Sequence, residues 1–178
     1  MDQQTSQNVA AINSMNAELT EMKKKWAAEN RVRDQERRKE ELTKVQQFLA
    51  ELQLILKRLR PIQFKLKDED FDAAQKLCHE FRESLDTKEI RLSYPDGYRA
   101  AYVVLSRLSS QLYKHRLRCS PDRLSPDGLD SRTVRDTSLQ DTVAPFVELG
   151  VEVFDQFATD VKEHIRKLQE QIVARVKS

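Results

Sequence analysis

Two ladders of apolar residues run through the first sixty positions, each with the alternating three- and four-residue steps of a helix that packs against another helix. The first ladder consists of Ile12, Met15, Leu19, Met22 and Trp26, and the second of Leu42, Val45, Leu49, Leu52, Leu56 and Leu59. This spacing predicts one long helix over about residues 6–59, which Pro61 is expected to stop.

The two ladders do not share a register, because sixteen residues separate Trp26 from Leu42. On a straight helix the second stripe is therefore rotated by about 150° from the first. Ten of the thirteen residues between Glu29 and Glu41 are charged. We predict either that the helix bends or breaks in this charged segment, or that its two halves face different partners.

The second stripe is wider than the first, because Phe48 and Ile55 flank it. A wide stripe is typical of a helix that packs against two neighbours in a bundle, whereas a narrow one suits a two-stranded coil. Residues 42–60 are therefore predicted to belong to a bundle, and residues 9–26 to form a pairing arm.

Three further helices follow from apolar periodicity and turn residues. One spans about Asp70–Leu85, with Asp68 or Asp70 as its cap. Another spans about Tyr98–Leu117, after a Pro95-Asp96-Gly97 turn. The last runs to about Lys177; it begins either at Thr137 or Ser138, with a kink at Pro145, or near Pro145 itself. Residues 118–137, with two Ser-Pro-Asp steps, are predicted to be a flexible loop.

These elements predict an all-α fold, an antiparallel bundle of about four helices whose long first and last helices extend as coiled-coil elements. The scarcity of glycine (3) and proline (5) agrees with this class. Residues 1–41 form an N-terminal coiled-coil arm and charged spacer, and residues 42–178 form the bundle. We expect Ile12–Trp26 to lie antiparallel beside Val161–Val176. The charged segment is then either a solvated single helix, or the arm swings away to another chain.

Charge and cysteine content restrict the class of protein. The net charge of only +2 argues against a dedicated nucleic-acid binder. Cys78 and Cys119 have no CxxC partner, so we expect reduced thiols. The first eight residues are polar and lack the apolar core of a secretory signal. The expectation is an intracellular protein, cytoplasmic or nuclear.

No motif for catalysis or metal binding accompanies the helices. His79, His115 and His164 lie on three different predicted helices, so we expect surface or boundary positions and no metal site. Ser109 and Ser110 have no GxSxG setting, and the glycines form no phosphate-binding loop. The sequence therefore predicts no enzyme, no cofactor and no small-molecule substrate.

Two basic clusters offer a different kind of surface. The first contains Lys57, Arg58, Arg60, Lys65 and Lys67, and the second includes Arg116 and Arg118. Both lie at the C-termini of predicted helices, where positive charge is favourable for structural reasons alone. In the predicted bundle the two clusters share one end, where together they form a candidate site for an acidic surface.

The sequence is best interpreted as a non-enzymatic helical scaffold or adaptor subunit of a larger intracellular assembly. Its partner-binding residues are those of the first ladder, and the partner is another helical protein or a second copy of the chain. The alternative is a peripheral binder of anionic membrane or nucleic acid through the basic clusters.

Overall fold

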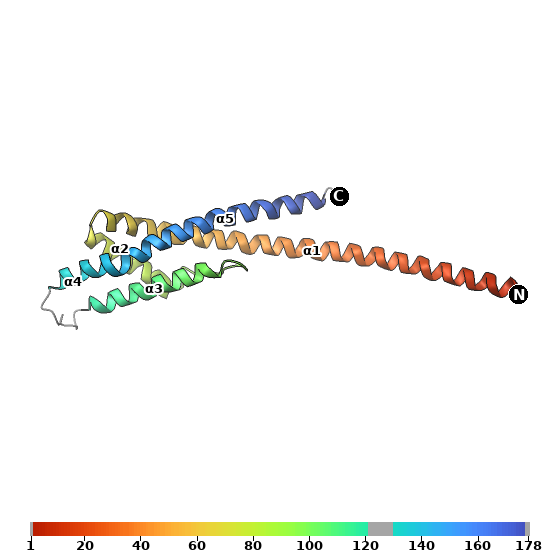
Figure 1. Cartoon of the computed structure of the whole chain (residues 1–178), viewed down its shortest axis with the longest axis horizontal. Helices are drawn as coiled ribbons and strands as arrows, with labels where there is room; N and C mark the ends of the chain where they lie inside the picture. Colours follow the sequence, from red (N-terminus) through yellow and green to blue (C-terminus); the bar gives the residue numbers. More distant parts are fainter. Residues whose placement is uncertain (1, 121–129, 177–178) are drawn as a thin grey trace.

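The computed structural model describes residues 2–120 and 130–176, with side chains for 6–120 and 130–174, and its regular structure in these ranges is helical. Helix α1 spans Asp2–Lys67, α2 spans Phe71–Asp86 and α3 spans Arg99–Arg118. Helix α4, Ser131–Ser138, leads directly into the π-helical turn η1, Leu139–Val143, and then into α5, Ala144–Val176. The predicted all-α fold with long first and last helices is confirmed (Figure 1).

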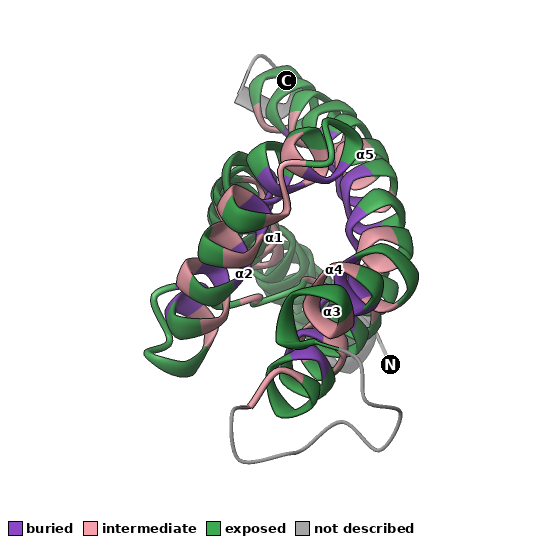
Figure 2. Ribbon diagram, turned by 90° about the vertical axis from the view of Figure 1, so that its left-hand side faces the viewer, coloured by how far each residue is buried: buried purple, intermediate pink, exposed green. Residues whose placement is uncertain are grey.

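The helices form an antiparallel bundle in which each runs opposite to its neighbours (Figure 1). Helix α1 packs against α2 and, most extensively, against α5, and α3 closes the ring by contacting α5 and α2. Viewed along the bundle axis, the buried faces of the helices point toward a common centre (Figure 2). We call this four-helix part, with α1 from residue 42 onward, the head.

The head core is built from every helix except the short α4. Its largest fully buried side chains are Phe48, Leu52, Ile55, Leu59 and Ile62 of α1, Phe81 of α2, Leu108 of α3, Leu139 and Val143 of η1, and Val147 and Phe154 of α5. A close approach of α5 to α1 occurs at Gly150, where an added Cβ would lie 3.3 Å from Leu59 Cδ1. Burying such side chains contributes roughly 1.5–3 kcal/mol each, which makes the head the stable part of the chain.

The buried face of α1 in the head is centred on different residues from those predicted to form its seam. Phe48 and Ile55, predicted to flank the seam, are fully buried, whereas Leu42 and Leu49 are only half-buried. The reason is that α1 is covered from two sides, by α2 and by α5. The centre of the buried face therefore lies between the two apolar rows.

Pro61 does not stop α1, which continues for another six residues to Lys67, so that prediction is wrong. Proline lacks the N–H that would bond to the carbonyl oxygen of Lys57, one turn earlier. Both Pro61 and Lys57 are exposed, so water can satisfy that carbonyl. The neighbouring Ile62 and Leu66 are buried in the head and hold the last turns in place.

Helix α2 and the segment that follows it agree with the sequence prediction. Asp70 caps α2 by accepting a hydrogen bond from the Ala73 N–H at 3.3 Å. In the predicted turn, the Tyr98 N–H donates to the Pro95 carbonyl at 3.1 Å, and Gly97 adopts a φ of 95°. The Tyr98 ring then packs between Phe48 and Phe157, which ties this connection to both long helices.

Part of the predicted loop at 118–137 is helical, because α4 begins at Ser131. The carboxylate of Asp130 caps it by accepting a hydrogen bond from the Thr133 N–H at 2.6 Å. Residues 121–129 lie outside the described residues. Near the predicted kink at Pro145 the helix contains a π-helical turn, Leu139–Val143, which ends two residues before the proline.

The C-terminal half of α5 lies beside the charged segment of α1 and not beside Ile12–Trp26, which corrects the predicted pairing. Arg38 donates to the Gln171 side-chain oxygen at 2.6 Å, and His164 lies 3.5 Å from Glu41. Helix α1 runs through this segment without a break. We call this two-helix part, residues 30–41 with residues 161–174, the stalk.

Candidate functional site

The part of α1 that extends beyond the stalk, residues 2–29, is here called the arm. Every described side chain from Ser6 to Glu29 is exposed, and the first half-buried residue is Asn30. Helix α5 covers α1 no further than the stalk, and the N-terminus of α1 projects far past the end of α5 (Figure 1). At about 1.5 Å per residue the arm is about 40 Å long.

The predicted partner-binding residues all lie on the arm, and all are exposed to solvent. Their exposed fractions range from 46% at Leu19 to 67% at Trp26. The set of Ile12, Met15, Leu19, Met22 and Trp26 is called the arm ladder below. Monomeric soluble proteins rarely leave such a continuous apolar row in water, and a row of this kind marks an interaction surface.

Local sequence favours the helical conformation of the arm, which has no tertiary contacts among the described residues. Residues 2–60 contain neither glycine nor proline, and five alanines lie between Ala10 and Ala28. An ion pair of 3.0 Å joins Lys24 to Glu21, and another of 3.7 Å joins Arg33 to Glu29. Such pairs add only a few tenths of a kcal/mol each, so packing against a partner would stabilise the arm further.

The first basic cluster is largely engaged with neighbouring carboxylates. Arg60 pairs with Asp155 at 2.5 Å and Lys67 with Glu148 at 3.8 Å, both bonds joining α1 to α5. Lys65 pairs with Asp70 at 2.8 Å, and this bond raises the pKa of the lysine and lowers that of the aspartate.

The remaining basic residues do not form one patch. Lys57 and Arg58 line an open groove of about 400 Å³ between α1 and α2. Arg116 lines a much smaller cavity on the other side of α2, facing α3. Arg118 donates to the Thr142 hydroxyl at 2.9 Å. The C-termini of α1 and α3 lie at the same end of the head (Figure 1). Helix α2 nevertheless separates Lys57 and Arg58 from Arg116.

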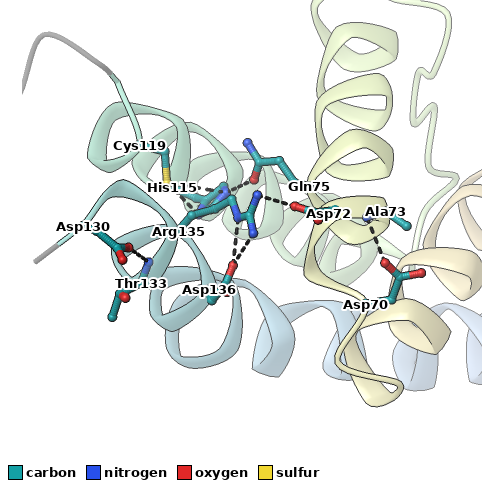
Figure 3. A network of polar contacts seen from close by, with 10 residues as sticks. All are labelled: Asp70, Asp72, Ala73, Gln75, His115, Cys119, Asp130, Thr133, Arg135 and Asp136. Atoms are coloured by element: carbon teal, nitrogen blue, oxygen red, sulfur yellow. Dashed lines mark hydrogen bonds and ion pairs between the residues drawn. The ribbon is translucent and has the colours of Figure 1, made fainter.

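A polar cluster at that end of the head was missed by the sequence analysis (Figure 3). His115 of α3 lies 3.0 Å from the Ser138 hydroxyl of α4 and 2.5 Å from the side-chain oxygen of Gln75 in α2. Arg135 of α4 bridges Asp136 at 2.7 Å and Asp72 of α2 at 2.5 Å. These bonds join three helices.

His115 is buried, with 3% of its surface exposed, so its predicted surface or boundary position is wrong. Because the amide oxygen of Gln75 can only accept, Nε2 of the ring carries the proton, and Nδ1 accepts from Ser138. Desolvation, together with the charges of Arg118 and Arg135, lowers the pKa of His115 to about 4. The imidazole is therefore neutral at pH 7.

The chemistry available to this polar cluster is limited by burial. Ser138 is buried with its hydroxyl bonded to His115, and the adjoining cavity measures about 40 Å³, which is room for water and not for a substrate. Cys119 lies one turn from His115, with Sγ 3.7 Å from Nδ1, but burial raises the pKa of its thiol. The i, i+4 spacing of His115 and Cys119 was the sequence signal for this contact.

Metal binding and membrane insertion would each require a particular arrangement of the described residues. No group of three or more His, Cys, Asp or Glu side chains among them is arranged to hold a metal ion. None of their helices combines the length and the apolar character that crossing a membrane requires.

Comparison with known proteins adds no family to these observations. No protein-family model, curated protein or solved structure matches the chain. Function is therefore inferred from the geometry of the arm, the stalk and the head.

Proposed function

We propose that the chain is a non-enzymatic helical scaffold or adaptor subunit, which joins a larger assembly by forming a coiled coil through the arm ladder. The observation that carries this proposal is the exposure of five large apolar side chains, at 3-4 spacing, on a helix that projects beyond its own bundle. In this function the head is a folded anchor, and the arm presents the binding face.

The free-energy cost of leaving apolar side chains in water supports this function. An exposed apolar side chain of this size forgoes roughly 1.5–3 kcal/mol that burial provides. The arm exposes five of them in one row, on the stretch of α1 whose described side chains are all exposed. A partner helix packed on the row removes both penalties, because it covers the apolar surface and stabilises the arm.

Binding of acidic surfaces through the basic clusters has weaker support. Arg60, Lys65 and Lys67 are already paired with carboxylates of the head. The remaining cations lie on two sides of α2, Lys57 and Arg58 in the groove and Arg116 at the small cavity, so they do not present one continuous surface to a phosphate group.

Photo-crosslinking tests the proposed function. A photoreactive residue replaces Leu19 on the arm ladder in one variant and Lys24 on the opposite face of the arm in a control. Cells expressing the full-length chain are irradiated, and the crosslinked products are sized. Products at position 19 and not at position 24 support the proposal. Crosslinks at neither position, with capture instead from a photoreactive residue at Lys57, contradict it.

A further inference from the structure

The a and d positions that continue the heptad repeat of the arm ladder along α1 remain exposed to solvent. In a heptad notation, Ile12, Leu19 and Trp26 are a positions and Met15 and Met22 are d positions. The positions that continue this register down the helix, from Glu29 to Phe64, are all exposed. In the arm and the stalk these positions stay exposed beside α5, so a second helix can lie along them, whereas from Leu54 onward they line the groove between α1 and α2.

We propose that the helix that covers the arm ladder is the arm of a second copy of this chain, aligned antiparallel. This inference rests on the proposed function and names the partner in it. The pairing places Leu19 opposite Met22 of the second copy, so that facing residues have numbers that sum to 41. The two heads then lie at opposite ends of a rod.

Side-chain sizes fit this alignment. Trp26 faces Met15 of the second copy, and Met15 faces Trp26 in return. An unbranched methionine adapts to a large ring and makes favourable sulfur contacts with it. In a parallel pair in register, the two Trp26 rings would have to share one layer.

Charges beside the ladder are self-complementary in the antiparallel pair. Glu18 and Lys25 are both g positions, and this alignment brings Glu18 of each copy next to Lys25 of the other. Two identical attractive contacts therefore form by symmetry. Both side chains are exposed in the single chain and free to reach across.

Residues beyond the ladder distinguish the two directions of pairing. In a parallel pair Glu29 would face Glu29 and Arg33 would face Arg33, so like charges would be stacked in successive layers. In the antiparallel pair Arg33 faces Asn8. The exposed Val32 then lies beside Ala11 of the second copy, which covers one more apolar side chain of α1.

The overlap sets the strength of the pair. The layers that contain ladder residues run from Ile12 to Glu29 of each copy, eighteen residues on each helix and about 27 Å long. The arm has no tertiary contacts with the described residues of its own chain, so pairing also stabilises its helix. The expected dissociation constant is micromolar, and the dimer dissociates on dilution.

Charge exchange in the full chain tests the alignment, with the dissociation constant measured by light scattering over a concentration series. Glu18→Lys converts two attractive contacts into two repulsive ones and should weaken the dimer by about fivefold. Adding Lys25→Glu to that variant should restore the original constant, and adding Lys23→Glu should not. Glu21→Lys, the same change at a position away from the seam, is the matched control; it removes only the ion pair with Lys24 inside the arm and should weaken the dimer less than Glu18→Lys does.

Each outcome decides between the models. Rescue by Lys23→Glu and not by Lys25→Glu would show a parallel pair and overturn the inference. A monomer at every concentration, combined with a crosslink from position 19 to a different protein, would overturn the inference and leave the proposed function standing. A crosslinked product of twice 20.8 kDa at position 19, together with rescue by Lys25→Glu, supports both.

Discussion

The two halves of α1 have ladders of the same spacing in opposite surroundings. Leu19 in the arm is 46% exposed, whereas Leu52 in the head is fully buried. The difference lies in what covers them. Helix α5 has 33 residues and is about 50 Å long, which suffices to cover the head and the stalk but not the arm. Apolar spacing thus specifies which face of a helix is to be covered, and the lengths of the other helices decide whether the chain itself can cover it.

The largest test of this comparison uses one substitution in both halves. Leu52→Ala should lower the free energy of unfolding of the head by about 3 kcal/mol, because it leaves a cavity among fully buried side chains. Leu19→Ala should change it by less than about 0.5 kcal/mol, because the arm adds nothing to the core. Urea denaturation followed by circular dichroism, at concentrations where the chain is monomeric, measures both. Equal losses would mean that the arm folds back on the head.

Acid should destabilise the head through His115. Its pKa of about 4 in the folded chain lies below the ordinary 6.5, so the unfolded chain takes up the proton first as pH falls. This contribution to stability is complete above pH 6.5 and is lost between 6.5 and about 4, a loss of roughly 3 kcal/mol.

Denaturation curves at pH 7 and pH 4.5 measure that loss, with His115→Gln as the comparison. The neighbouring Arg118 and Arg135 and all the carboxylates are the same residues in both proteins. The variant should therefore show a smaller acid loss than the unchanged chain. The same acid sensitivity in both would assign it to groups other than His115.

Pro61→Ala should stabilise the head by about 1 kcal/mol. Alanine restores an N–H that can bond to the carbonyl of Lys57 and has the higher helix propensity, although it also makes the unfolded chain more flexible. Thermal and urea unfolding measure the change. If the variant is less stable, α1 does not continue as a regular helix through this position.

The smallest expected effect is spectroscopic and concerns the arm alone. Trp26 is the only tryptophan and is exposed, so its fluorescence in dilute solution should resemble that of indole in water. Association through the arm ladder should shift the emission to shorter wavelength as concentration rises. Leu19→Asp should remove the shift without altering the far-ultraviolet signal of the head. An unchanging spectrum in the original chain would mean that Trp26 stays in water.

Local sequence carried most of the information for the fold. The α2 helix follows from its apolar face and its cap at Asp70, and the Pro95-Asp96-Gly97 turn follows from its residue types. Asp130 is also a good capping residue, but the capping-box pattern at Thr137 led to a predicted start of the last helix at Thr137, Ser138 or near Pro145, whereas helical structure begins at Ser131. The continuation of α1 past Pro61 depends on burial of Ile62 and Leu66, which is a tertiary effect.

Contacts between distant segments could not be predicted in the same way. The arm ladder was identified from sequence, but its pairing with Val161–Val176 was wrong because residue spacing does not show where two antiparallel helices align. The burial of His115 depends on Gln75 and Ser138, which lie 40 and 23 residues away in the chain. Polar bonds between helices have no periodic signal in any one of them.

The uninterrupted run of α1 from arm to head makes the charged segment a spacer of fixed length and rotation. Each residue inserted there would move the arm outward by about 1.5 Å and turn it by about 100° about the helix axis. One inserted residue would aim the ladder in a new direction, whereas seven would nearly restore its direction about 10 Å farther out. The number of residues between Trp26 and Leu42 thus sets both the distance and the angle at which the head is held from whatever the arm binds.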